Sequence, residues 1–248
     1  MAVLVELPAA TSADPTCTVT WTGTAGDGSW QTAENWSTDS VPSSSDVACI
    51  GSGTTVHVTG GSNAVGTLLD EGTLDISSGS LELAGSEASR TASLALSGGS
   101  LTGVGELDVS GSLSWAGGSM TGSGKTALGS GVSGSIDPGV GNAVSLTERE
   151  LVNEGTLTWS SGSVKGRSDA EIDNSGTLIA DAQPASSGEW STHGLLNSDG
   201  SNVWVENTGT IKKAAGGEFT MIQFQIDNEG TIGSPLALGV KRGLKWYS

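Results

Sequence analysis

The sequence is poor in cationic and aromatic side chains. Its 248 residues include 10 lysines and arginines against 27 aspartates and glutamates, which gives a formal net charge of −17, and only 4% are aromatic. Nucleic acids and anionic membranes are bound through clustered lysine and arginine, so this charge argues against both kinds of partner. The acidic surface either keeps a secreted protein soluble or binds cations through outward carboxylates.

Long apolar runs and catalytic motifs are lacking as well. No run of 18 apolar residues occurs, so we expect no insertion into a membrane. The chain contains no Gly-x-Ser-x-Gly elbow, no His-Glu-x-x-His, no P-loop and no Cys-x-x-Cys pair. Its two cysteines, Cys17 and Cys49, both occur in strand-like contexts near the N-terminus. We expect a disulfide between them that closes the first coil, as in an extracellular protein; two buried free thiols are the alternative.

Two short phrases recur along the chain. A small-residue turn followed by an apolar residue has its central glycines at positions 79, 99, 118 and 162. An Asn-x-Gly-Thr phrase has its asparagines at Asn153, Asn174, Asn207 and Asn228, which are 21, 33 and 21 residues apart. Repeats near this length, with apolar residues at alternate positions between turns, predict an all-β, single-stranded parallel β-helix of about ten coils with ~20 residues each. We expect it to be right-handed, the hand of most natural parallel β-helices.

The same alternation predicts which side chains face inward. Trp115 and Trp159 each follow an inward leucine by two residues, so both should lie in the core. The four asparagines are expected at turns with left-handed backbone geometry, stacked coil upon coil.

The chain divides into four segments. We expect an unstructured lead at 1–15, a capping segment at 16–50, solenoid repeats at 51–235 with a loop insertion at 182–194, and an atypical tail at 236–248. The capping segment contains Trp21, Trp30 and Trp36. Because an uncovered sheet edge invites pairing with other chains, a capping role is favoured over ligand binding for these rings.

Two weak candidate sites involve the histidines. His57 points outward in a predicted strand, and Asp75 lies about one coil later together with Asp70 and Glu71. His57 is thus either an ordinary exposed residue or a metal ligand with Asp75; calcium or zinc is the cation such a site would take. The second candidate lies in the inserted loop, where Glu189, Trp190 and His193 form either a ligand-contacting cluster or a loop folded onto the rod.

Parallel β-helices also include carbohydrate-active enzymes. A glycosidase needs two facing carboxylates, for which Glu154 and Glu171 on adjacent coils are candidates. A lyase would place a basic residue beside a calcium site, and the one compact candidate comprises Lys165, Arg167, Asp169 and Glu171. Regular Thr-x-Thr ranks for ice binding are too sparse.

The opening phrase carries a resemblance to a known group of proteins. It comprises Trp21-Thr22-Gly23, Gly28-Ser29-Trp30, Asn35-Trp36, Val41-Pro42 and Asp46-Val47, and Gly/Ser/Thr-rich coils follow it. This pattern resembles bacterial secreted, autotransporter-like surface proteins with haemagglutinin-type β-helix repeats.

The resemblance implies a secreted or cell-surface protein that acts in adhesion, in glycan contact or as a structural stalk. Its partners would be a glycan or cell-surface component and other domains of a longer parent protein. No catalytic residue carries over from the resemblance. The alternative function is a hydrolase or carbohydrate-active enzyme, metal-assisted or not, that uses outward carboxylates or histidines of the solenoid.

Overall fold

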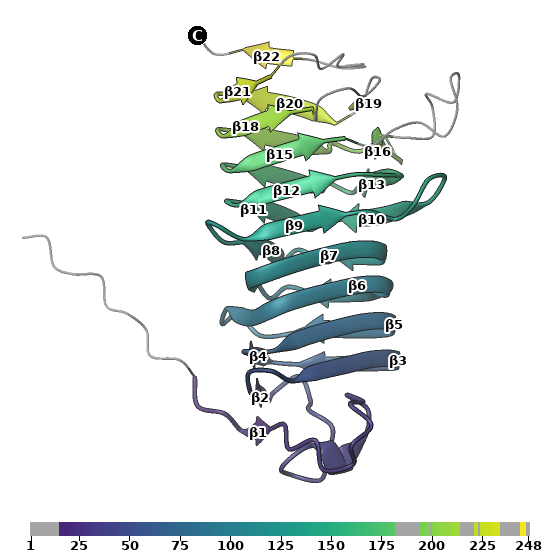
Figure 1. Ribbon diagram of the computed structural model, residues 1–248, viewed down its shortest axis with the longest axis vertical. Coiled ribbons are helices and arrows are strands. Elements are labelled where there is room, and N and C mark those ends of the chain that lie inside the picture. Colours follow the sequence, from purple (N-terminus) through teal and green to yellow (C-terminus); the bar gives the residue numbers. More distant parts are fainter. Residues whose placement is uncertain are drawn as a thin grey trace, which may run out of the picture.

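The protein is an elongated β-solenoid (Figure 1). The computed structural model describes residues 15–181, 194–198, 200–213, 221–222, 224–233 and 244–246. Parallel strands stack in about eight turns with essentially no helix, which confirms the predicted fold class. The turns are fewer than the ten expected, because the cap takes up part of the chain and one repeat is lengthened to 33 residues.

Three parallel ladders run along the rod, and we number them sheets I to III. In the first turns, long strands bend and contribute to more than one sheet, whereas each of the four turns from β8 to β19 has three short strands. Sheet I contains β1 (Val19–Thr20), β2 (Val47–Ile50), β4 (Thr67–Asp70), the starts of β6 (Ser89–Gly103) and β7 (Leu107–Thr121), β8 (Lys125–Leu128), β11 (Glu150–Asn153), β14 (Glu171–Asn174), β17 (Trp204–Asn207), β20 (Gln225–Asn228) and β22 (Leu244–Trp246).

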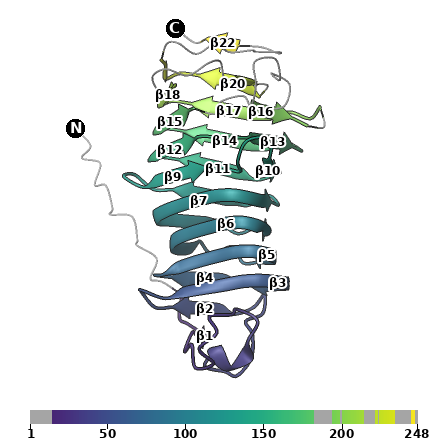
Figure 2. The same ribbon diagram turned by 45° about the vertical axis from the view of Figure 1, so that its right-hand side comes forward.

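Sheets II and III complete each turn. Sheet II contains the starts of β3 (Thr55–Val65) and β5 (Thr73–Leu83), the middles of β6 and β7, β9 (Ser133–Ile136), β12 (Thr156–Trp159), β15 (Thr177–Ala180), β18 (Thr210–Lys212) and β21 (Thr231–Ile232). Sheet III contains the ends of β3, β5, β6 and β7, then β10 (Ala143–Thr147), β13 (Ser163–Arg167), β16 (Gly194–Asn197) and β19 (Met221–Ile222). Figure 2 shows β11, β14, β17, β20 and β22 of sheet I one above the other.

Side chains alternate between inward and outward directions along the strands, as the sequence predicts, and the inward side chains fill the interior. Inward positions of the short strands are buried and the positions between them are partly or fully exposed. Trp115 and Trp159 are both buried in the core, so their predicted inward direction is confirmed. The indole Nε1 of Trp159 donates to the Ser161 carbonyl at 3.0 Å, whereas Nε1 of Trp115 has no hydrogen-bond partner.

The asparagines of the repeated phrase are the last residues of their strands in sheet I, and their side chains form a buried ladder. Each Nδ2 donates to Oδ1 of the next asparagine at 2.6 Å, from Asn153 to Asn174, Asn207 and Asn228 in turn. The expectation of stacking is confirmed, but the expected left-handed backbone is wrong. Among the described residues other than glycine, positive φ occurs only at Asp39, Glu148, Ser168 and Asp169. The asparagines end β-strands and face inward, where satisfied amide groups are tolerated.

The glycine of the same phrase is required by close stacking. A Cβ on Gly176 would collide with the carbonyl oxygen of Gly155 in the preceding turn, and the same contact recurs between Gly209 and Gly176. The phrase therefore encodes a buried amide at its first position and close backbone approach at its third.

The N-terminal end of the rod is closed by tryptophans. Trp30 and Trp36 are buried, as expected for a cap, while Trp21 is partly exposed. Trp36 contacts the other two rings edge-on, each at a centroid distance of 4.9 Å, and its Nε1 donates to the Trp30 carbonyl at 2.8 Å. The predicted Cys17–Cys49 disulfide is present beside this cap. The alternative of two free thiols is therefore wrong.

A buried arginine joins three successive turns where the long strands give way to short ones. The Arg149 guanidinium donates to the carbonyls of Gly103 and Gly105 two turns below, to those of Thr121 and Lys125 one turn below, and to the Thr126 hydroxyl. The Arg149 side chain is fully buried, and this burial lowers its pKa to about 10.

The tail contributes to the stack. Leu244–Trp246 pairs in parallel with β20, so this part of the atypical tail at 236–248 continues sheet I. The inserted loop with Glu189, Trp190 and His193 lies outside the described residues.

Candidate functional site

The outward side of sheet I gathers carboxylates from successive turns. We call this surface, from β7 to β20, the acidic face. In register, Glu150 lies over Lys125 and under Glu171, while Asp173, Glu206 and Asp227 follow one another in the neighbouring column. Its acidic members among the described residues are Glu106, Asp108, Glu150, Glu154, Glu171, Asp173, Glu206 and Asp227.

A shallow groove of about 350 Å³ lies at the lower part of the acidic face. Asp108, Ala127 and Val152 follow one another in register through the groove, and the short Ala127 side chain leaves room between its neighbours. Lys125 lines the groove and forms a 2.7 Å ion pair with Glu150. The remaining lining is mainly acidic or small, so the groove presents hydrogen-bond acceptors around one ammonium group.

Burial, and after it repulsion between neighbouring carboxylates, raises the pKa of several carboxyls on the acidic face. The pKa of Glu171 is raised first by burial and then by repulsion from Glu206 and Glu150. Burial and the Glu150 charge likewise raise the pKa of Asp173. The pKa of Lys125 is raised, mainly by its hydrogen bond to Glu150. Crowded like charges on adjacent coils are thus a property of this face.

An outward tryptophan adjoins these carboxylates. Val205 and Asn207 are buried on β17, so Trp204 between Val203 and Val205 points outward, and its side chain is partly exposed. In register it lies between Glu171 of β14 and Gln225 of β20. An aromatic face flanked by carboxylate and amide groups can stack on an apolar surface while the neighbours accept or donate hydrogen bonds.

His57 and Asp75 are brought together, as the candidate metal site required. Their strands pair in register, and Nδ1 of His57 lies 2.8 Å from Oδ2 of Asp75. His57 is also bridged through its backbone to Ser29 of the cap. Asp70 and Glu71 lie on or beside sheet I rather than sheet II, and within the described ranges no group of three or more metal-ligating side chains occurs. The pair therefore joins the cap to the first turns.

The two enzyme candidates from the sequence are rearranged by the fold. Glu171 stacks on Glu150 rather than on Glu154, because Glu154 follows the asparagine that ends β11. Lys165 and Arg167 lie on β13 of sheet III, whereas Glu171 lies on sheet I, so the proposed lyase cluster does not converge. The first correction arises from the register of the stacked turns, and the second because the chain changes sheet between Arg167 and Glu171.

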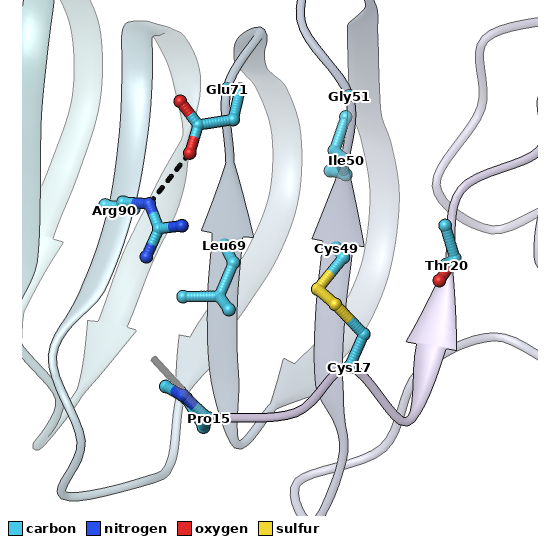
Figure 3. A pocket seen from close by; sticks show the side chains of 9 residues that line it. All are labelled: Pro15, Cys17, Thr20, Cys49, Ile50, Gly51, Leu69, Glu71 and Arg90. Atoms are coloured by element: carbon cyan, nitrogen blue, oxygen red, sulfur yellow. Dashed lines mark hydrogen bonds and ion pairs between the residues drawn. A yellow bond between two sulfur atoms is a disulfide. The ribbon is translucent and has the colours of Figure 1, made fainter. Parts of the chain in front are cut away.

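A second concavity, of about 340 Å³, lies beside the disulfide (Figure 3). Leu69, Cys49 and Cys17 line it, with the Arg90–Glu71 ion pair at its edge, where Nε of Arg90 lies 2.9 Å from Oε1 of Glu71. Leu69 points outward but is only 6% exposed. Pro15 also lines the concavity, so the residues just before Cys17 contribute to its wall (Figure 3).

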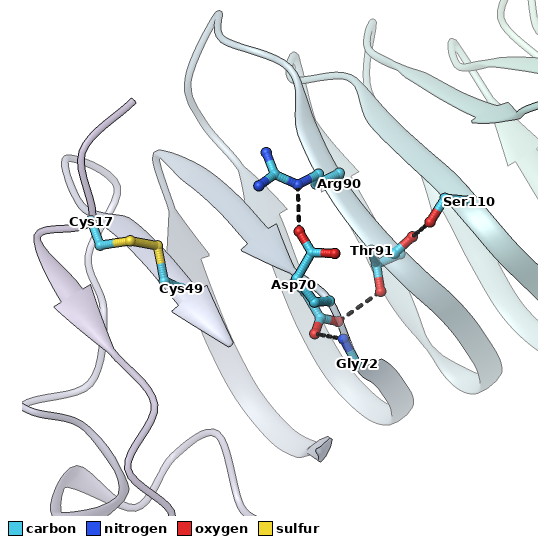
Figure 4. Close-up of polar contacts among 8 residues, drawn as sticks. Cys17, Cys49, Asp70, Gly72, Arg90, Thr91 and Ser110 are labelled. Atoms are coloured by element: carbon cyan, nitrogen blue, oxygen red, sulfur yellow. Dashed lines mark hydrogen bonds and ion pairs between the residues drawn. A yellow bond between two sulfur atoms is a disulfide. The ribbon is translucent and has the colours of Figure 1, made fainter. Parts of the chain in front are cut away.

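The carboxyl of Asp70, at the end of β4, is buried (Figure 4). It accepts hydrogen bonds from the Gly72 amide at 2.7 Å and from the Thr91 hydroxyl at 2.6 Å. Burial raises the pKa of Asp70, and these two hydrogen bonds oppose the rise. Gly72 belongs to the turn after β4 and Thr91 to the next coil, so the Asp70 carboxyl links the two and stabilises the stack.

Together these features define a parallel β-solenoid with an N-terminal tryptophan cap, a disulfide and one acidic side. Comparison with protein-family models, with curated proteins and with solved structures found no match. Among the described helices, none has the length and apolar character needed to cross a membrane.

Trp204 was not among the residues predicted from the sequence. The Asn-x-Gly-Thr phrase could have predicted its outward position next to the carboxylates. Counting three residues back from each asparagine gives Glu150, Glu171, Trp204 and Gln225, which is the observed column.

Proposed function

We propose that this chain is a secreted surface protein whose solenoid acts in adhesion and contacts glycans through the acidic face. The observation that carries the proposal is the placement of Trp204, outward and in register between Glu171 and Gln225. Sugar rings present C–H faces that stack on aromatic rings and hydroxyls that bond to carboxylates and amides. The capped, disulfide-bonded rod provides a rigid support for such a surface, in keeping with an extracytoplasmic location.

The charge of the face narrows the glycan class. Carboxylates line the groove and Glu171 flanks Trp204, so acidic polysaccharides would be repelled. Neutral or amine-bearing glycans fit the surface, because their hydroxyl and ammonium groups donate hydrogen bonds to carboxylates.

A retention assay on immobilised glycans tests this function. Trp204→Ala should lower affinity about tenfold, which corresponds to ~1.4 kcal/mol. Val140→Ala is the matched control, because Val140 is also an exposed apolar residue but lies in the turn between sheets II and III. Wild-type protein that retains no glycan, or equal retention by Trp204→Ala, would contradict the proposal.

A second candidate is a carbohydrate-active hydrolase, and one observation favours it. Glu171, with its raised pKa, stacks on Glu150, which is ion-paired with Lys125. Glycosidases use two neighbouring carboxyl groups, one a proton donor and one ionised. Under this proposal Glu171→Gln would abolish hydrolysis of a bound glycan while leaving binding intact. Hydrolysis unaffected by Glu171→Gln would eliminate this assignment.

A further inference from the structure

The Cys17–Cys49 disulfide lies at the surface, and its two ends differ in accessibility. Cys17 is exposed, whereas Cys49 lies within β2 and is half-buried. Both residues line the 340 Å³ concavity, which opens beside the sulfur–sulfur bond (Figure 3). Exposed disulfides are the ones that external thiolates reach and exchange with. A volume near 300 Å³ is the lower end of the range for small-molecule sites.

The segment that carries Cys17 leads directly into β1 and is held by bonds that do not involve sulfur. The Thr18 amide donates to the Val47 carbonyl at 3.0 Å, and the Trp21 amide donates to the Cys49 carbonyl at 2.8 Å. The Thr18 hydroxyl donates to Asp46 at 2.9 Å. These contacts keep β1 paired with β2 when the disulfide opens, so the fold tolerates exchange.

Opening the disulfide would change one local contact. Pro15 and Cys17 border the concavity that contains the outward side chain of Leu69. Freed from Cys49, residues 15–17 lose their disulfide link to β2. We expect Leu69 to become more exposed as a result. It is an apolar residue in the same column as Cys49 and Arg90.

We propose that Cys17–Cys49 is a thiol–disulfide exchange site for small-molecule thiols, a function separate from glycan contact. The thiolate of the incoming molecule attacks Sγ of Cys17, a new sulfur–sulfur bond forms, and the Cys17–Cys49 bond breaks. The electron pair of that bond leaves on Sγ of Cys49, which becomes a thiolate and takes a proton. A second thiol then attacks the mixed disulfide, releasing the Cys17 thiolate and an external disulfide. Two external thiols are oxidised for each protein disulfide reduced.

Mass analysis of folded protein treated with glutathione tests the site. With one equivalent of glutathione and alkylation at early times, before a second thiol releases the adduct, we expect adducts with a single glutathione, attached to Cys17 on peptide mapping, with Cys49 alkylated and the far-ultraviolet circular dichroism unchanged. The Cys17→Ser/Cys49→Ser double variant should give no adduct. Adducts that form only after unfolding in denaturant, or that lie on Cys49, would overturn the proposal.

The charge at the edge of the concavity supplies a second test. Glu71→Gln removes a carboxylate that repels the glutathione anion, so exchange should be roughly two- to fivefold faster, with a smaller gain at high salt. Glu82→Gln is the matched control, because Glu82 is an exposed carboxylate on sheet III. Equal rates for Glu71→Gln and wild type at low salt would place the reaction outside this concavity.

Discussion

Asn174 donates a 2.6 Å hydrogen bond from its Nδ2 to Oδ1 of Asn207, which lies 33 residues later in the chain. The same bond joins Asn153 to Asn174 and Asn207 to Asn228, although 21 residues separate the members of those pairs. The ladder therefore keeps the turns in register when the connection between them lengthens. Insertion of the 182–194 segment changes the length of one turn without changing the register of sheet I.

The middle of the asparagine ladder should be more sensitive to substitution than its start. Asn174→Ala leaves Oδ1 of Asn207 without its donor and leaves Nδ2 of Asn153 only the Thr177 carbonyl as acceptor, and should cost about 2–4 kcal/mol in the free energy of unfolding. Oδ1 of Asn153 already lacks a partner, so Asn153→Ala should cost less. Urea unfolding of both variants measures the difference. A larger cost for Asn153→Ala would show that the ladder does not stabilise the stack.

Removing the Arg149 guanidinium should unfold the junction between the two kinds of turn. Arg149→Met removes the hydrogen bonds that the guanidinium donates to four carbonyls and the Thr126 hydroxyl, and should cost about 3–5 kcal/mol. Arg167→Met, an exposed arginine on β13, is the control and should change stability by less than about 0.5 kcal/mol. Similar thermal midpoints for the two variants would contradict a stabilising role for the buried side chain.

The two core tryptophans should respond differently to loss of the indole nitrogen. Trp159→Phe removes the donor to the Ser161 carbonyl, whereas Trp115→Phe removes a buried donor that has no partner. Trp159→Phe should therefore cost about 1 kcal/mol more than Trp115→Phe. Equal costs, measured by denaturant unfolding, would mean that the Trp159 bond contributes nothing beyond packing.

Charge crowding on the acidic face should make stability depend on pH. The pKa of Glu171 is raised in the folded state above its ordinary value of 4.5. Its contribution to stability is thus present below the unfolded pKa and is lost as the pH rises through the folded pKa. Glu171→Gln should be more stable than wild type at pH 7, by less than about 1 kcal/mol because the carboxyl is partly solvated. The difference should disappear near pH 4.

Thermal unfolding of Glu171→Gln and wild type from pH 4 to pH 7 tests this pH dependence, with Glu82→Gln on sheet III as the control. A difference that grows as the pH falls would have the wrong sign for a raised pKa.

Much of the fold follows from local pattern in the sequence. Alternation gives the inward direction of Trp115 and Trp159, and the spacing of Asn153 and Asn174 gives the stacking period. The backbone conformation of the asparagines could not be predicted in this way, because a residue that precedes a turn in sequence can also be the last inward residue of a strand. Only the ladder of neighbouring turns shows that the amide faces inward.

The acidic face was harder to predict because it depends on which residues of successive turns align in register. Glu154 and Glu171 are close to one repeat apart, yet the register pairs Glu171 with Glu150. The five carbonyl and hydroxyl partners of Arg149 come from two different preceding turns, and no sequence pattern indicates that a lone arginine is buried among them. By contrast, the His57–Asp75 contact follows directly from alternation and the local period of 18 residues.

Tryptophan oxidation footprinting tests the central claim, glycan contact through the acidic face, most directly. The protein would be labelled with and without a glycan that it retains, and modification would be compared at each tryptophan. Trp30, Trp36, Trp115 and Trp159 are buried and should react slowly in both states, whereas Trp21 and Trp204 are partly exposed. We predict that the glycan protects Trp204 and leaves Trp21 in the cap unchanged; protection of Trp21 without protection of Trp204 would contradict the account.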